Sequence, residues 1–319
     1  MGADLFGSLA ESTCAALVVS GTSPSLVIAT GAYYYPLCIS AFGILACVAT
    51  WFFATQPEMC CRIQRFSDVE KVIKGQLLIS TAILVPGLYL VTLVCLPTEF
   101  SFEGIETVVT RNGCYICTLC GLVSGFIIGI VTEYYTSNEY APVKELAESC
   151  KKGPAPNVIK GLALGYLSNI IPVILLAITI YVSFKNADMY GIALAALGML
   201  SNLCISLAID GYGPISDNAG GIAEMCHLHF TRTRTDKLDA AGNTTAAIGK
   251  GFAIGSACLV SLALFGAFAT RCQLTVVNVL EPLQFSGLVI GSMLPYAFTA
   301  LTMKAVGTAA EAMIEEIAR

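Results

Sequence analysis

Long apolar runs separated by short polar segments dominate the hydrophobic pattern of this chain. A helix that crosses a bilayer needs roughly 20 predominantly apolar residues. Eight runs of this length occur, each bounded by charged or turn-forming residues, and lipid requires that their backbone groups be paired within a helix. They cover residues 5–28, 31–55, 76–97, 113–135, 158–184, 190–209, 245–270 and 283–306. The pattern predicts an all-α fold, a polytopic transmembrane helical bundle without a separate soluble domain.

Lysine and arginine residues are distributed unevenly between the two ends of these spans. If the spans alternate in direction, one side of the membrane receives only Arg111, Lys185 and Arg271, and the other receives the rest of the 17 basic residues. Cytoplasmic loops of membrane proteins are enriched in Lys and Arg. We therefore expect both termini of this chain to lie in the cytosol.

Composition supports the membrane class and argues against others. Hydrophobic residues make up 56% of the 319 residues and charged residues only 12%, about half the charged share of a soluble domain. Because the basic residues are sorted by membrane side and form no continuous stripe, we expect no nucleic-acid partner. Most of the 14 cysteines lie in apolar spans, where Cys behaves as a small hydrophobic residue, so we expect free thiols.

The first apolar run contains ionisable residues, which are costly in a membrane unless they are paired or hydrated. Asp4, Ser8 and Glu11 follow one another at spacings of four and three residues, which places them on one face of a helix. This face is a candidate pathway for ions. The alternative is a frayed helix end that lies among the lipid headgroups.

A second acidic group follows the sixth run. Asp210, Asp217 and Glu224 are spaced by sevens, so they share a face if one helix continues through the segment with a kink at Pro214. If Pro214 ends the helix, the spacing carries no meaning. Glycines on both sides of Asp217 would let another helix, or an anion with its metal, approach closely.

A third polar group leads into the seventh run. Asp236, Asn243 and Lys250 are also spaced by sevens, and Asp239 lies about one turn from both Asp236 and Asn243. The two stripes together could line one site, with carboxylate and amide oxygens for Mg²⁺ and an ammonium for a phosphate. The alternative is an interhelical network of structural salt bridges. On their own, the intramembrane carboxylates indicate a non-enzymatic cation transporter or channel.

Several longer motifs connect these residues. They are residues 211–225 (GYGPISDNAGGIAEM), 238–245 (LDAAGNTT), 249–256 (GKGFAIGS), 132–137 (TEYYTS), 4–8 (DLFGS) and 293–296 (MLPY). In these motifs the chain resembles the membrane-bound inorganic pyrophosphatases along its entire length. The resemblance implies a homodimeric pump that hydrolyses Mg²⁺-pyrophosphate on the cytosolic side and moves cations across a membrane. In a eukaryote, that membrane would be vacuolar or of the acidocalcisome type.

The resemblance also assigns roles to individual residues. Asp217 and Asn243 would be ligands of the metal or substrate, and Lys250 a cationic neighbour. Asp210, Glu224 and Asp239 are weaker candidates for metal binding.

Ion choice and potassium dependence follow from the same resemblance. Proton-pumping relatives commonly carry a first-helix glutamate two turns beyond the aspartate, as Glu11 follows Asp4, whereas sodium-pumping relatives carry it nearer. Relatives that need no potassium have Lys and Thr where this chain has Ala246 and Gly249. We therefore expect a pump for protons, with a sodium pump as the alternative, and K⁺ as an activator.

The resemblance covers only a central block of the family's pattern. The family has about sixteen membrane helices, and this chain resembles eight of them. Aspartates that activate water in the family belong to segments outside this block. The 319 residues alone are therefore expected not to hydrolyse pyrophosphate.

Overall fold

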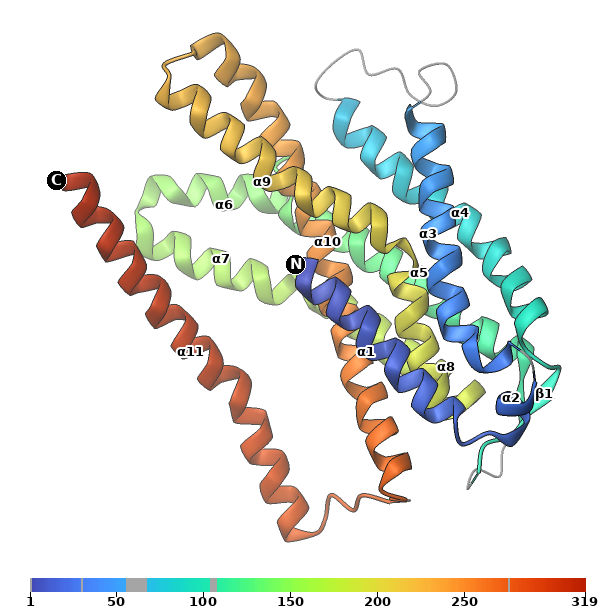
Figure 1. Ribbon diagram of the computed structural model, residues 1–319. Coiled ribbons are helices and arrows are strands. Elements are labelled where there is room, and N and C mark those ends of the chain that lie inside the picture. The colour runs from blue at the N-terminus through green and yellow to red at the C-terminus, as the bar shows by residue number, and fades with distance from the viewer. Residues whose placement is uncertain (1, 30, 56–67, 104–107, 275) are drawn as a thin grey trace. The chain divides into compact units, whose positions relative to one another are not determined.

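Helices account for nearly all of the structure, a computed structural model that describes residues 2–29, 31–55, 68–103, 108–274 and 276–319. The chain forms two compact units, Met1–Phe268 and Ala269–Arg319. In chain order, the first unit contains α1 (Gly2–Ser20), α2 (Pro24–Ile28), η1 (Ala32–Tyr34), α3 (Tyr35–Thr55), α4 (Asp68–Cys95), β1 (Glu99–Phe100), β2 (Val109–Thr110), α5 (Arg111–Thr136), α6 (Ala141–Ser149), η2 (Cys150–Lys152), α7 (Pro154–Ser168), α8 (Ile170–Met199), η3 (Leu200–Asn202) and α9 (Leu203–Met225) (Figure 1). α10 (His229–Arg271) begins in the first unit and ends in the second, which also contains α11 (Pro282–Ala318).

The predicted all-α class is confirmed. Within the described ranges, the sheet consists of β1 and β2 alone, paired antiparallel with Glu99 opposite Thr110 and Phe100 opposite Val109. This short ribbon connects α4 to α5. Thr110 also caps α5, because its side chain accepts a hydrogen bond from the backbone amide of Gly113.

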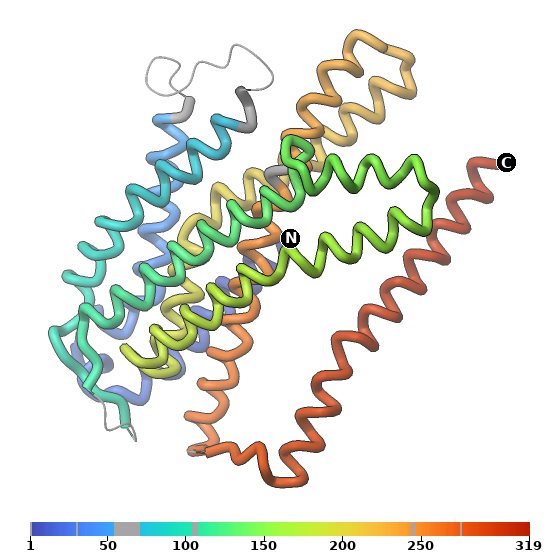
Figure 2. Tube along the Cα trace, turned by 180° about the vertical axis from the view of Figure 1, so that it is seen from behind, coloured from blue at the N-terminus to red at the C-terminus, as the bar shows by residue number. Residues whose placement is uncertain are grey.

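Seven stretches of the described residues are long and apolar enough to cross a bilayer. The fifth and sixth predicted spans both lie in one of them, residues 154–225. This stretch contains a break in α8, where Ala187 and Asp188 leave the helical conformation and Asp188 has a φ of 51°. Beyond the break the chain turns back on itself (Figure 2), so that a Cβ on Gly191 would lie 2.3 Å from the carbonyl oxygen of Ser183. The two predicted spans are thus the two arms of a helical hairpin.

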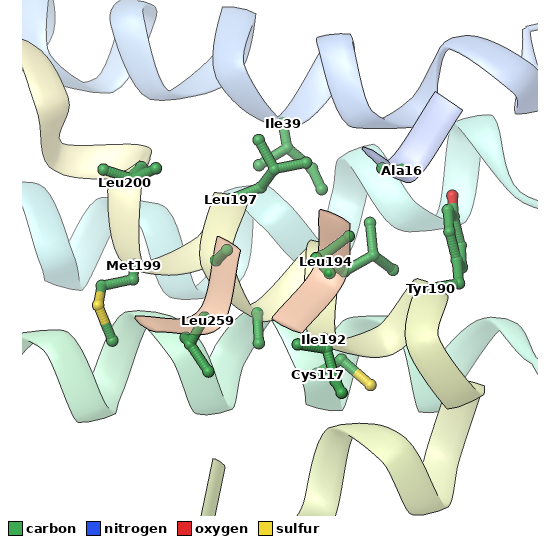
Figure 3. Packing of buried hydrophobic residues seen from close by; sticks show 14 of the residues in the cluster. Ala16, Ile39, Cys117, Tyr190, Ile192, Leu194, Leu197, Met199, Leu200 and Leu259 are labelled. Carbon is green, nitrogen blue, oxygen red and sulfur yellow. The ribbon is translucent and has the colours of Figure 1, made fainter. Parts of the chain in front are cut away.

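The second arm of this hairpin forms the centre of the core. Residues 190–203 are all buried, and α1, α3 and α5 pack around α8. Figure 3 shows Ile39 of α3 beside Leu197, and Cys117 of α5 beside Ile192. Residues 190–200 are apolar on every side of the helix, as a fully surrounded position requires.

Glycines bring α5 and α8 into backbone contact. A Cβ on Gly121 would lie 1.8 Å from the carbonyl oxygen of Ala195, and one on Gly198 would lie 2.0 Å from that of Thr118. No side chain fits in either place. Small residues at such crossings let membrane helices gain close van der Waals packing, which replaces the hydrophobic driving force that lipid does not supply.

The outer surface of the first unit is apolar. Large side chains on α3 and α4 are more than half exposed, among them Trp51, Leu78 and Val94. Soluble proteins rarely expose such continuous apolar surface, whereas lipid accepts it without cost. The structure therefore describes an integral membrane protein.

Candidate functional site

The polar face of α1 lines an open cavity. Asp4, Ser8 and Glu11 border a volume of about 290 Å³ whose opposite wall belongs to α10. The α10 wall consists of Ala253, Ile254 and Ala257. Ser8 is buried, while the two carboxyl-bearing side chains are exposed. The three residues lie on one face, as their spacing predicts, and the cavity has room for several water molecules of about 30 Å³ each.

α9 continues through Pro214 without ending, which decides between the two interpretations of the second acidic group. Asp210, Asp217 and Glu224 therefore lie along one side of a single helix. A tight turn then reverses the chain into α10, and His227 occupies this turn with a φ of 55°. The acidic stripe on α9 and the polar stripe on α10 consequently belong to the two arms of one helical hairpin.

Small residues hold the two arms of this hairpin together. A Cβ on Gly242 of α10 would lie 2.7 Å from the Ser216 hydroxyl and 3.1 Å from the Gly213 Cα. The Tyr212 hydroxyl donates a hydrogen bond of 3.0 Å to the Leu238 carbonyl oxygen. By contrast, Gly211 and Gly221 have nothing within 4 Å of an added Cβ. Gly213 therefore serves the approach of a neighbouring helix.

Asp217, Asp239 and Asn243 form a polar group across the hairpin. The Asn243 Nδ2 donates a hydrogen bond of 3.1 Å to the Asp239 Oδ2. The Asp239 Oδ1 is buried and accepts no hydrogen bond from the side chains that the structure describes. Burial and then the negative charge of Asp217 on the opposite arm disfavour the charged Asp239 carboxylate, and the Arg232 guanidinium offsets part of this effect. A bound cation would stabilise this arrangement, because it would offset the repulsion between the Asp217 and Asp239 carboxylates and give the buried Asp239 Oδ1 a partner.

Glu224 and Asp236 belong to a different part of the hairpin, closer to the turn. Arg232 contacts both, with its Nη1 3.1 Å from the Glu224 Oε2 and its Nε 2.6 Å from the Asp236 Oδ1. The Glu224–Arg232 pair joins α9 to α10 and is the kind of interhelical salt bridge that is the alternative to metal binding, whereas the Asp236–Arg232 pair lies within α10. The side chain of Glu224 is 70% exposed and forms a salt bridge with Arg232.

The remaining predicted residues lie apart from this polar group. The Asp210 Oδ2 would be 3.6 Å from a Cβ on Gly2, so Asp210 lies beside the first turn of α1. Lys250 is exposed on α10, seven residues beyond Asn243. Ala246 is half-buried and faces α9, because a Cβ added to Gly213 of α9 would lie 3.6 Å from the Cβ of Ala246. Gly249 is buried.

The donor set suits a cation that keeps part of its hydration shell. In the described part of the chain, no three His, Cys, Asp or Glu side chains come close enough to hold a metal ion among them. Mg²⁺ typically uses one or two carboxylates together with water and substrate phosphates. The Asp217 and Asp239 carboxylates and the Asn243 amide fit that requirement, whereas they would not fit an ion enclosed by protein ligands.

A buried carboxylate on α5 was not among the predicted site residues. Glu133 is 6% exposed, forms an ion pair with the Nζ of Lys74 on α4, and accepts a hydrogen bond of 3.4 Å from the Tyr140 hydroxyl. An acidic residue at the end of an apolar span is the signal that could have indicated it. Its partners could not be read from the sequence, because Lys74 precedes it by 59 positions.

The apolar helices, the acidic cavity along α1 and the polar α9–α10 hairpin together define a polytopic membrane protein with intramembrane carboxylates. Comparison with protein families identifies it further. The family described as inorganic H⁺ pyrophosphatase matches residues 1–319, and the chain belongs to this family.

Relatives in this family are named as ion pumps of several kinds. A putative K(+)-stimulated pyrophosphate-energized sodium pump of Clostridium tetani is 41% identical, over all of this chain and 45% of that protein. A K(+)-insensitive pyrophosphate-energized proton pump of Methanosarcina mazei is 36% identical, over all of this chain and 46% of that protein. A K(+)-stimulated pyrophosphate-energized sodium pump of Thermotoga maritima is 40% identical, over 68% of this chain and 32% of that protein. This chain spans less than half the length of these relatives.

Proposed function

We propose that this chain forms the substrate-binding and ion-conducting middle of a pyrophosphate-energised proton pump. The observation that carries this proposal is the Asp217–Asp239–Asn243 group, which places oxygen donors and one unpaired buried oxygen within the most extended family motifs. The names of the relatives in the inorganic H⁺ pyrophosphatase family support pyrophosphate as the substrate.

The chemistry of pyrophosphate fits the polar side of the hairpin. The substrate carries several negative charges, so carboxylates can hold it only through a bound cation. Asp217, Asp239 and Asn243 would hold Mg²⁺, which would neutralise phosphate oxygens and stabilise the leaving phosphate. The Lys250 ammonium would contact a phosphate oxygen directly. Glu224 would keep Arg232 in place, and Asp210 would lie between the hairpin and α1.

Protons are the ion proposed for the α1 cavity, from the spacing of its two carboxylates. Glu11 stands two turns beyond Asp4, the spacing that accompanies proton pumping in the family, and both border the same cavity. Water in the cavity would let the two carboxylates exchange protons along α1, with the buried Ser8 hydroxyl as a hydrogen-bonding group between them. Because relatives of both ion types match the chain, a sodium pump is the alternative.

Potassium would act as an activator at the contact between α9 and α10. Ala246 and Gly249 are small where potassium-independent relatives carry Lys and Thr. Since Ala246 packs opposite Gly213, a lysine ammonium there would lie at the α9–α10 contact. In this chain, a K⁺ ion would supply the positive charge at that place.

The assembled pump is proposed to be a homodimer with the cytosolic side at both termini of this chain. The Lys and Arg asymmetry between the two ends of the spans supports this orientation. In a eukaryotic cell, a vacuolar or acidocalcisome-type membrane would contain it.

The decisive experiment measures phosphate release by membranes that contain the complete gene product. We expect release to require Mg²⁺, to increase with K⁺, and to fall by about 100-fold or more in Asp217→Ala. Glu145→Ala, which removes an exposed carboxylate from α6, is the matched control and should hydrolyse pyrophosphate normally. Unchanged hydrolysis in Asp217→Ala would refute the assigned role.

Transport is tested separately in sealed vesicles. Pyrophosphate should acidify the vesicle interior without Na⁺, and a protonophore should abolish the signal. An absolute requirement for Na⁺ would exclude the proton assignment. Gradient-driven cation flux without any pyrophosphate hydrolysis would instead support a transporter or channel.

A further inference from the structure

Two cysteines from distant parts of the chain lie side by side in the bundle. Cys204 on α9 packs against the small cluster of buried residues that contains Cys47 of α3. Both cysteines border one cavity of about 230 Å³. They also pack in one small apolar cluster, together with Ile205 and Ile209. These thiols are 157 positions apart in the sequence and belong to neither polar group described above.

Close backbone contact brings the two thiols together. A Cβ on Gly43 of α3 would lie 2.5 Å from the carbonyl oxygen of Ser201 in η3, so the two backbones touch at this point. Cys47 follows Gly43 by one helical turn, and its Sγ is 4.0 Å from the same carbonyl oxygen. Cys204 follows Ser201 by three residues. A disulfide requires Cα atoms within about 7 Å, and the backbone contact one turn away keeps the two cysteine-bearing segments close together.

The cavity provides a route for a small oxidant. Cys47 itself is 4% exposed, but Val48 and Trp51 on the cavity wall are 57% and 64% exposed. A neutral oxidant of the size of a peroxide can enter a space of this volume. Buried Cys47 and half-buried Cys204 are therefore accessible to a small oxidant through the cavity, and Cys47 is inaccessible to a large reagent.

We propose that Cys47 and Cys204 are an oxidative modification site at which a peroxide forms a disulfide between α3 and α9. The two thiols lose two protons and two electrons, one Sγ–Sγ bond forms, and the peroxide O–O bond breaks to give two molecules of water when the oxidant is hydrogen peroxide. One thiol is first oxidised to a sulfenic acid, and the second thiol displaces water from it.

The disulfide would act on the helix that carries the candidate site. Cys204 lies in the first turn of α9, which also contains Asp210 and Asp217. A covalent link to α3 fixes this turn against a helix that carries neither of the polar groups. This functional consequence rests on the proposed function, while formation of the disulfide does not depend on it. We expect oxidation to slow hydrolysis reversibly, by roughly fivefold or more.

A second thiol pair offers a matched control. Cys95 of α4 and Cys38 of α3 also lie close enough to interact electrostatically. A disulfide between them would join α3 to α4 and leave α9 unconstrained. Removing this second pair should therefore not protect the protein from inactivation.

The experiment uses the complete gene product in membranes, treated with hydrogen peroxide and then digested with chymotrypsin. This protease cleaves after aromatic residues that no proline follows, so Cys47 lies in the peptide 43–51, Cys204 in 191–212, Cys38 in 35–42 and Cys95 in 90–100. We expect mass spectrometry to detect a disulfide-linked pair of peptides 43–51 and 191–212 that dithiothreitol separates. Absence of this linked pair after oxidation would overturn the proposal.

Hydrolysis is measured on the same samples. Oxidation should reduce phosphate release by the natural protein and by Cys95→Ser, and dithiothreitol should restore it. Cys47→Ser and Cys204→Ser should each remain active after oxidation. If the linked peptides form and phosphate release does not change, the effect on α9 is refuted. If untreated protein releases no phosphate, the proposed function fails, and the linked peptides still decide whether the site exists.

Discussion

Two helix pairs in this protein use glycine for close contact, with different results. Between α5 and α8, Gly121 and Gly198 bring backbones together in a region that is apolar and fully enclosed. Between α9 and α10, Gly213 and Gly242 do the same, but carboxylates, an amide and a guanidinium lie along the contact. The first contact leaves no room for any ligand. The second holds oxygen donors at fixed spacing beside exposed surface.

The difference shows that close packing stabilises the fold at the α5–α8 contact and positions polar side chains at the α9–α10 contact. A charged group in the α5–α8 contact would have no partner and no water. In the α9–α10 hairpin, the same backbone proximity keeps the Asp239 Oδ1 buried while Asp217 and Asn243 stay exposed. Substitutions in the two pairs should therefore affect different quantities.

The largest effect is expected from Gly198→Ala in α8. The added Cβ would lie 2.0 Å from the Thr118 carbonyl oxygen, so the helices must separate, at a cost of about 3 kcal/mol or more. Thermal unfolding of the solubilised protein should show a large drop in Tm or loss of folded protein. Gly165→Ala on α7, where nothing lies within 4 Å of an added Cβ, is the control and should keep the natural Tm. Equal behaviour of both variants would contradict the described contact.

The next effect is expected from Asp239→Asn in α10. The amide keeps the size of the side chain but removes the charge that a cation needs, so we expect hydrolysis to fall by about 10- to 100-fold and the Mg²⁺ requirement to rise. A Mg²⁺ titration of phosphate release measures both, and Tm should stay nearly constant. Asp236→Asn, which removes a carboxylate already paired with Arg232, is the control. If Asp239→Asn needed the same Mg²⁺ concentration as the natural protein, Asp239 would be excluded as a ligand.

A moderate effect is expected from Ala246→Lys at the α9–α10 contact. The ammonium would supply the positive charge that K⁺ otherwise provides, so hydrolysis should become independent of K⁺. Rates measured with and without K⁺ in a constant Na⁺ background test this directly. Ala246→Met, which adds similar length without charge, should retain the dependence on K⁺. A variant with lysine that still requires K⁺ would show that the ion acts elsewhere.

The smallest effect is expected from Glu224→Gln near the turn of the hairpin. Its salt bridge to Arg232 is largely exposed, so the free energy of unfolding should change by less than about 1 kcal/mol. The rate of phosphate release by Glu224→Gln should remain close to that of the natural protein. A loss of activity comparable to that of Asp239→Asn would restore Glu224 as a metal ligand and end the distinction between the two parts of the hairpin.

Local spacing predicted a large part of the structure. Apolar runs located the spans, because the requirement for about 20 apolar residues is set by the membrane and not by distant contacts. The spacing of Asp4, Ser8 and Glu11 predicted their shared face, and the heptads of α9 and α10 predicted two polar stripes. The sequence left open whether Pro214 ends α9, because proline disrupts a helix unless surrounding contacts hold it.

Contacts between distant residues could not be derived in this way. The pairing of Lys74 with Glu133 and of Cys47 with Cys204 depends on how helices cross, which one sequence does not specify. The heptad spacing also gave no reason to separate Glu224 from Asp217, although Arg232 lies beside only one of them. The role of Asp217 stays a prediction that Asp217→Ala tests, and the roles of Asn243 and Lys250 stay predictions.

The length of α10 has a mechanical consequence. Its 43 residues correspond to about 65 Å of helix, roughly twice the thickness of the bilayer core. Asn243 and the cavity-lining residue Ala257 lie on this one rod, about 20 Å apart, with no proline between them. A stiff rod transmits an axial displacement without loss. Any movement of Asn243 along the helix axis would therefore shift the wall that faces Asp4 and Glu11 by the same amount.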